Sequence, residues 1–217
     1  MKVAIAIAAT LLAAAPLAAA DPLAPLDDST PGFAMTAAHG GSPSAYGSVA
    51  LRAGVTIYDA RFRRVAKTDA NAPIVREAAA PLAGLGHVAQ LARAKQIVAD
   101  RVRYKSDPDA MRVADLWANA GETLQSGQGD DEDIAIATMQ MLKAAGYPED
   151  DLYLSVGRHP ARGAHIVLLA RTEDGYYMLD HLQAAPIKVD AATNAFRPIL
   201  SVGRGGSWVH GYRTARR

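Results

Sequence analysis

The spacing of apolar residues changes near Gly146, and this change constrains the fold of the 217-residue chain more than any other feature. Residues 131–145, DEDIAIATMQMLKAA, carry apolar side chains at helical spacing, and the glycine that follows them is a typical helix stop. Three later segments are rich in β-branched, aromatic and leucine residues and are separated by turn signals, which is typical of an antiparallel meander. These segments are DLYLSVG (151–157), AHIVLLART (164–172) and GYYMLDHL (175–182). A central helix followed by antiparallel strands predicts the α+β class.

The segments on either side of this unit give weaker signals. Residues 87–104, HVAQLARAKQIVADRVRY, have an apolar stripe that predicts an amphipathic helix. Two prolines favour loops or short turns over residues 66–86. Near the end of the chain, residues 196–202 predict a last strand and residues 203–212 predict a glycine-rich turn.

Several single residues in these segments carry expectations of their own. Asp107-Pro108 is a helix-start signal, because an N-cap residue precedes proline at the first helical position. Trp117 is expected to anchor the core. Three histidines outside the strand centres, at positions 87, 159 and 210, are expected to be polar surface residues.

The first 20 residues are expected to form a cleaved secretory signal peptide. They combine Lys2, a short alanine-rich apolar stretch and a small-residue site before Asp21. An uncleaved membrane anchor is disfavoured, because a spanning helix needs about 20 strongly apolar residues. We therefore expect a periplasmic or secreted protein without stable membrane insertion.

Residues 21–50 are rich in Pro, Gly, Ser and Ala and are expected to form a flexible segment, which leaves residues 51–217 as the folded domain. The chain has 23 Lys and Arg against 22 Asp and Glu, so no basic excess points to nucleic acid. It contains no cysteine. Disulfides, a thiol nucleophile and thiolate metal ligands are therefore excluded.

Four acidic residues in a row, Asp130, Asp131, Glu132 and Asp133, begin the predicted central helix. Capping and the helix dipole explain one or two of them, at roughly 0.3–1 kcal/mol each. Four adjacent carboxylates repel one another, and Ca²⁺ would explain them because it binds six to eight oxygen ligands. Two interpretations stay open: a calcium site, or a capped and solvated acidic turn. The spacing is not that of an EF-hand.

Four motifs occur in the order typical of one enzyme family. They are Trp117, the helix start Gly129–Ala135, the strand His165–Leu168, and Leu179-Asp180-His181, and a closing SVGRGGSWVHG segment follows them. Together they resemble the bacterial transglutaminase-like cysteine proteinases, a periplasmic family that includes calcium-dependent proteases releasing surface adhesins. The resemblance implies a papain/transglutaminase-like fold with the central helix packed on the antiparallel sheet.

The sequence departs from the family pattern at the nucleophile. The resemblance implies that Asp131 stands where the family has its catalytic cysteine, that His165 is the base, and that Asp180 orients it. His181 follows Asp180 where the family has asparagine. By motif position, the residues implied as calcium ligands are Asp130, Glu132 and Asp133.

The substitution at position 131 changes the expected chemistry. A carboxylate that attacked a peptide carbonyl would form an anhydride that reverts, so acyl-enzyme proteolysis is not expected. We instead expect Asp131 to form an ion pair with His165 and to raise the pKa of that histidine. A zinc site of His165, His181 and Asp180 is disfavoured, because adjacent residues on a strand point to opposite faces.

These observations predict a catalytically inactive homologue of the family that acts as a calcium-dependent module binding a protein or peptide. A surface adhesin segment is the candidate partner implied by the resemblance. The alternative is a hydrolase of altered chemistry in which Asp131 and His165 activate water.

Overall fold

A computed structural model describes residues 41–66, 70–105, 117–190 and 195–212, which all belong to one compact unit of the chain. The expected signal peptide and the helix-start signal at Asp107-Pro108 lie outside these residues. Among the helices described, none is long and apolar enough to cross a membrane.

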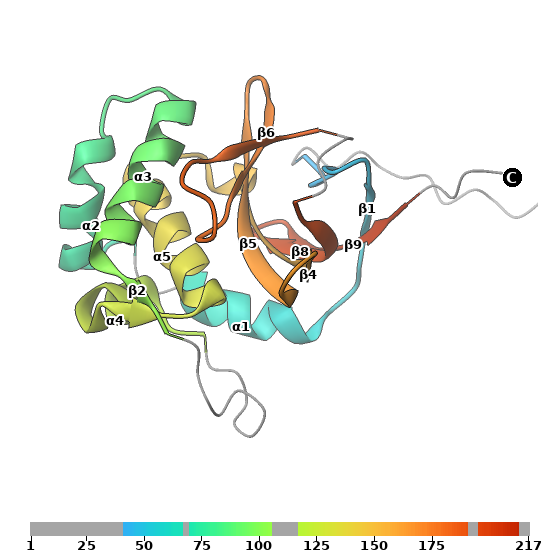
Figure 1. The fold of residues 1–217 in the computed structure, drawn as a ribbon, viewed down its shortest axis with the longest axis horizontal. Coiled ribbons are helices and arrows are strands. Elements are labelled where there is room, and N and C mark those ends of the chain that lie inside the picture. The colour runs from blue at the N-terminus through green and yellow to red at the C-terminus, as the bar shows by residue number, and fades with distance from the viewer. Residues whose placement is uncertain (1–40, 67–69, 106–116, 191–194, 213–217) are drawn as a thin grey trace, which may run out of the picture. The chain divides into compact units, whose positions relative to one another are not determined.

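The centre of this unit is a seven-stranded antiparallel sheet that curls strongly (Figure 1). Its strand order is β1-β9-β8-β4-β5-β6-β7. The strands are β1 (Val49–Arg52), β4 (Leu152–His159), β5 (Gly163–Thr172), β6 (Gly175–Leu179), β7 (Ile187–Val189), β8 (Arg197–Gly203) and β9 (Gly206–Gly211). The predicted meander is confirmed as β4, β5 and β6, and the predicted hairpin turn pairs Thr172 with Gly175.

The helices gather around α5, which packs against α2, α3, α4 and the centre of the sheet (Figure 1). The helices are α1 (Ile57–Ala66), α2 (Pro73–Ala79), α3 (His87–Arg101), α4 (Ala120–Ser126) and α5 (Asp131–Ala144), with short 3-10 turns at Ala80–Leu82 and Glu149–Asp151. The predicted helices at 87–104 and 131–145 are confirmed with slightly shorter bounds. The predicted stop at Gly146 is also confirmed, because this residue has φ +89° and Tyr147 N donates back to Leu142 O.

Side chains on both faces of β5 are buried. Ile166, Leu168 and Ala170 point toward the helices and join the larger core. Val167 and Leu169 point to the opposite face, where a second core includes Tyr153, Phe196 and Trp208. Successive residues of a strand point to opposite faces, so a strand that is apolar throughout must be covered on both sides.

Two segments differ from the sequence prediction. Residues 66–86 contain α2 and a 3-10 turn rather than mostly loop, because Pro73 lies in the first turn of α2, where proline favours a helix start. Residues 203–212 form β9 after a turn of two residues, rather than a long glycine-rich turn. In both segments, buried apolar side chains such as Val75 and Trp208 favour regular structure over a loop.

The N-terminal boundary also differs. The end of the segment expected to be flexible, residues 21–50, enters the fold, since Ala45 and Tyr46 are buried and Val49 starts β1. Backbone hydrogen bonding to β9 and burial against Phe196 give this glycine- and serine-rich stretch a fixed structure that its composition does not reveal.

The expected core residue is found, but the three histidines expected at the surface are not fully exposed, since His87 and His159 are half-buried and His210 is buried. Trp117 is buried as predicted and its ring stacks on Tyr58. His210 is not a surface residue: its two ring nitrogens lie 2.8 Å from Ser48 Oγ and 2.8 Å from Ser201 Oγ inside the sheet. Burial lowers the pKa of His210 to about 4, so this histidine is a neutral part of the structure.

Gly157 provides a test of the packing between β4 and β8. The pairing register shifts beside it, and a Cβ added there would lie 2.5 Å from the Phe196 ring and 2.9 Å from Pro198 Cα. We expect Gly157→Ala to lower the free energy of unfolding by about 1–3 kcal/mol through overpacking. Chemical denaturation measures the change. The matched control is Gly54→Ala, whose Cβ would meet no atom within 4 Å and should change stability by less than about 0.5 kcal/mol.

Candidate active-site remnant at the start of the central helix

The start of α5 is held by a short parallel pair of strands, β2 (Arg103–Tyr104) and β3 (Gln128–Gly129). Asp130 caps the helix, because its Oδ1 accepts from the Asp133 backbone N at 3.4 Å. Gly129 is required by packing, since a Cβ there would lie 2.7 Å from Asp133 Cβ. Asp131 is therefore fixed as the first residue of the helix.

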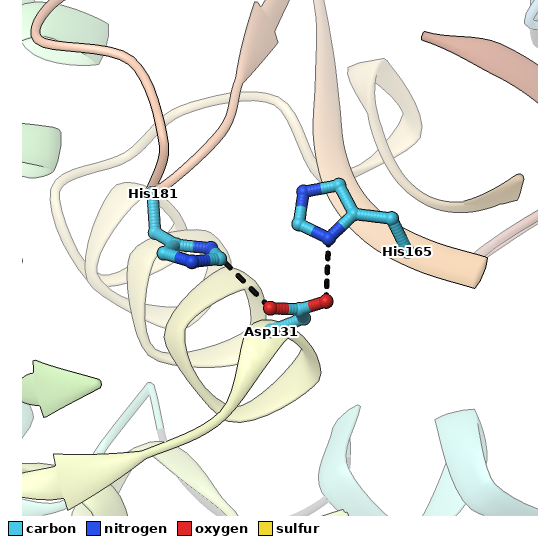
Figure 2. Close-up of side chains that lie close together, drawn as sticks. All are labelled: Asp131, His165 and His181. Carbon is cyan, nitrogen blue, oxygen red and sulfur yellow. Dashed lines mark hydrogen bonds and ion pairs between the residues drawn. The ribbon is translucent and has the colours of Figure 1, made fainter. Parts of the chain in front are cut away.

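The structure brings Asp131, His165 and Asp180 together from three different elements. His165 lies on β5, and its Nδ1 is 2.5 Å from Asp131 Oδ2 (Figure 2). Its Nε2 is 2.9 Å from Oδ1 of Asp180, which directly follows β6. The His165 and Asp180 side chains are fully buried, whereas that of Asp131 is 17% exposed.

Each ring nitrogen of His165 thus faces a carboxylate. Burial by itself lowers the pKa of His165, but the hydrogen bonds and negative charges of Asp131 and Asp180 outweigh burial and raise the pKa to about 9. For Asp180, burial has the opposite effect and raises the pKa. Hydrogen bonds from His165 and the Leu182 backbone N outweigh burial and bring the pKa of Asp180 below its usual value. The predicted contact between Asp131 and His165 is present, and the two carboxylates around the ring favour its protonated form, as expected.

His181 lies closer to this group than the sequence argument allowed. Its Nδ1 is 3.5 Å from Asp131 Oδ1 (Figure 2). Its ring stacks on Tyr104, with 4.7 Å between the ring centroids. The argument that His181 must point away from Asp180 was wrong, because β6 ends at Leu179 and strand alternation does not extend to the turn beyond it. Sequence reasoning also missed Tyr104, which no motif marks.

The other acids at the helix start have local roles. Asp133 Oδ1 accepts from the Ala118 backbone N at 2.8 Å, and Asp130 is the N-cap. Glu132 is almost completely buried. Their oxygen chemistry suits calcium, but these three carboxylates do not form a compact ligand group within the described part of the chain. The described structure therefore supports capping directly and fits calcium only in part.

A small cavity of about 180 Å³ adjoins His181. Besides His181, its lining comes from α3, Val102, β2 and α5: Lys95, Val98, Ala99, Val102, Tyr104, Ile134 and Thr138. The ion-paired group therefore lies next to a recess that could accept a side chain of a bound polypeptide.

Comparison with known proteins identifies the family. The sequence profile of the bacterial transglutaminase-like cysteine proteinases matches residues 67–212. The chain belongs to this family. Its fold is similar to that of Legionella pneumophila LapG in the calcium-bound form, with 23% identity and a TM-score of 0.56 over 70% of this chain and 87% of that one. EGTA-treated LapG gives the same identity and TM-score over 75% and 90% of the two chains. No functionally curated protein matches.

The family match supports the fold that the sequence predicted and draws attention to the start of α5. The papain/transglutaminase-like fold expected from the sequence is confirmed, with α5 as the central helix. This transglutaminase-like proteinase homologue has no cysteine anywhere in its sequence. At the helix start it carries the carboxylate of Asp131, which contacts the buried histidine.

The paired histidine predicts a specific pH dependence. Because the folded-state pKa of His165 lies above its ordinary value of 6.5, the two ion pairs stabilise the fold fully below about pH 6.5, and this stabilisation is lost as the pH rises through about 9. The loss should be on the order of 3 kcal/mol. We expect NMR in metal-free buffer to show that His165 titrates near pH 9 and that Asp131→Asn lowers this midpoint.

The same spectra contain an internal control. His210 should stay neutral down to about pH 4, because it is buried without a charged partner. A His165 midpoint near 6.5 in the unmodified protein would show that the two carboxylates do not hold the proton.

Proposed function

We propose that this protein is a non-proteolytic member of its family that is exported and binds a protein or peptide. The observation that carries the proposal is the Asp131–His165 contact of 2.5 Å in a chain without cysteine. The position at which the resemblance implies a thiol nucleophile holds a carboxylate, and that carboxylate is already paired with the histidine. Export rests on the signal-like first 20 residues.

Acyl-enzyme proteolysis needs a nucleophile whose adduct can be hydrolysed, and a histidine that can take up a proton. A carboxylate gives an anhydride with a peptide carbonyl, which returns to the starting peptide. Both nitrogens of His165 face carboxylate oxygens, so neither is available to a water molecule. The pairing of both His165 nitrogens also counts against the alternative hydrolase, in which Asp131 and His165 would activate water.

Binding is supported by the recess beside His181. Its lining combines the apolar side chains of Val98, Val102 and Ile134 with the polar groups of Lys95, Thr138 and His181, and Ala99 beside them is exposed. An extended polypeptide crossing the start of α5 could place an apolar side chain there while its backbone passes Asp131. A segment of a surface adhesin is the partner class that the family resemblance suggests.

Calcium is the second part of the proposal. LapG, whose fold this chain shares, has been solved in a calcium-bound form. Asp130, Glu132 and Asp133 would supply carboxylate oxygens, the donor type that calcium prefers. Asp130 and Asp133 each use one oxygen in a local hydrogen bond, so binding would require some rearrangement of the helix start.

The first test restores the nucleophile. We expect the unmodified protein not to cleave casein or an adhesin fragment from the same organism, and Asp131→Cys to gain measurable cleavage because His165 and Asp180 are already in place. Asp131→Cys combined with His165→Gln is the control and should be inactive. Cleavage by the unmodified protein that disappears in Asp131→Asn would instead support the hydrolase alternative.

A binding measurement addresses the recess independently of catalysis. Ala99→Arg should weaken binding of the adhesin fragment by about tenfold or more, since a charged side chain would enter an apolar contact. The matched control is Ala92→Arg, at an exposed alanine of the same helix that does not line the recess. Equal effects of the two substitutions would count against binding at this place.

The calcium proposal is tested by thermal unfolding. Calcium at 100 times its Kd should stabilise the protein by about 2.7 kcal/mol, which corresponds to a rise in Tm of roughly 5–10 °C for a chain of this size. The rise should be absent with Mg²⁺ and in Asp133→Asn, and it should persist in Asp174→Asn, which alters an exposed acid in the hairpin turn. An equal rise with Mg²⁺ would leave the acids as a capped helix start.

A further inference from the structure

We propose that Asp131, His165 and His181 form a binding site for a divalent transition metal ion, with Zn²⁺ as the best chemical fit. One ligand atom from each of these residues lies within 4.8 Å of the others. Two imidazoles and one carboxylate are a donor set that zinc sites use, usually with a fourth position left to water. This site is separate from the proposed calcium ligands and involves none of them.

The distances suit a small ion after modest side-chain movement. Ligands bound about 2.0–2.2 Å from a tetrahedral metal lie roughly 3.3–3.6 Å apart. Asp131 Oδ1 and His181 Nδ1 are already 3.5 Å apart. Asp131 Oδ2 and His165 Nδ1 are 2.5 Å apart and must separate by about 1 Å. Because the two contacts use different oxygens, the carboxylate must also turn toward the ion. Figure 2 shows the two rings on either side of the carboxylate, with one contact to each oxygen.

The surroundings already orient both imidazoles. His165 Nε2 contacts Asp180 Oδ1 at 2.9 Å, which directs Nδ1 toward Asp131. Metal-binding histidines usually donate their other ring N–H to such a carboxylate, which fixes the tautomer and increases the basicity of the ligand nitrogen. The His181 ring is held by nearly parallel stacking on Tyr104, with an interplanar angle of 5°.

Unsatisfied polar atoms provide a second observation. Asp131 Oδ1 is buried and has no hydrogen-bond partner, and the same is true of His181 Nε2. A buried polar atom without a partner is costly, and a metal ion next to Asp131 Oδ1 would satisfy that atom. Apart from these ligands, the described part of the chain holds no other group of three His, Asp or Glu side chains placed to bind a metal.

The chemistry favours a transition metal over calcium at this point. Imidazole nitrogen suits Zn²⁺, Co²⁺, Ni²⁺ and Cu²⁺, whereas calcium prefers oxygen ligands. On binding, the metal takes the place of the proton between His165 Nδ1 and Asp131, and that proton leaves to solvent. The side chains of Asp131 and His181 are 17% and 12% exposed, so the group lies near the surface, and a fourth ligand would come from water or from a carboxylate of a bound peptide.

The test uses the purified full chain after chelator treatment. Calorimetric titration with Zn²⁺ should give one equivalent per chain, and Co²⁺ should give the intense visible absorption of a tetrahedral site. His181→Gln and Asp131→Asn should each weaken Zn²⁺ binding by more than the roughly 10–100-fold that outer-shell changes produce. Circular dichroism confirms that each variant is folded. Because His181 lies outside the regular strands and is partly exposed, its substitution should not prevent folding.

The matched control is His159→Gln. The His159 ring lies 5.6 Å from the His165 ring, yet this residue is not part of the ligand group, so its substitution should leave Zn²⁺ affinity unchanged. Equal losses in His159→Gln and His181→Gln, octahedral Co²⁺ spectra in the unmodified protein, or binding weaker than millimolar would overturn the proposal. Any of these results would leave the peptide-binding and calcium tests unaffected, because those tests use other substitutions, at Ala99 and Asp133, and other readouts.

Discussion

The contact on which the site depends is a buried imidazole held between two carboxylates. His165 on β5 links Asp131, at the start of α5, to Asp180, at the end of β6. Three elements distant in sequence are therefore joined by one ring. Removing one partner of a buried, charged contact costs about 3–5 kcal/mol, because the other charge is left uncompensated. The two contacts of His165 thus help to hold the start of α5 against β5, whether or not the site has a catalytic or binding role.

The position of Asp131 follows from the burial of α5. This helix is surrounded by α2, α3, α4 and the sheet, and residues Ala135 to Leu142 are all buried. A helix so enclosed cannot slide or rotate without disrupting the core, so core packing holds its first residue opposite β5. Its N-terminus carries a partial positive charge that stabilises the carboxylate there. Core packing therefore determines the position of Asp131, and the helix dipole stabilises its negative charge.

The sequence could predict the elements whose apolar spacing is regular, which are α3, α5 and the three strands of the meander. It could also predict the Asp131–His165 ion pair, because the family order of motifs placed both residues. It missed α2, where proline acts as a first-turn residue rather than a breaker, and β1, which is defined by its pairing with β9. The contact of His181 with Asp131 was missed because strand alternation was extended beyond the end of β6. Distances between separate elements are set by tertiary packing, which local patterns do not encode.

An aspartate at the position where the family resemblance implies a cysteine is compatible with a site that persists under the proposed loss of proteolysis. In papain-like enzymes, a thiolate at a helix N-terminus faces an imidazolium. A carboxylate at that place has the same charge, so the ion pair and the favourable helix-dipole interaction remain. A carboxylate differs from a thiolate in that it does not form a hydrolysable acyl intermediate with a peptide. His165 and Asp180 then keep a structural reason to be present, because each is buried and each balances the charge of its neighbours. The presence of two triad residues is therefore compatible with binding alone, and the same electrostatic balance makes the carboxylate available as a metal ligand.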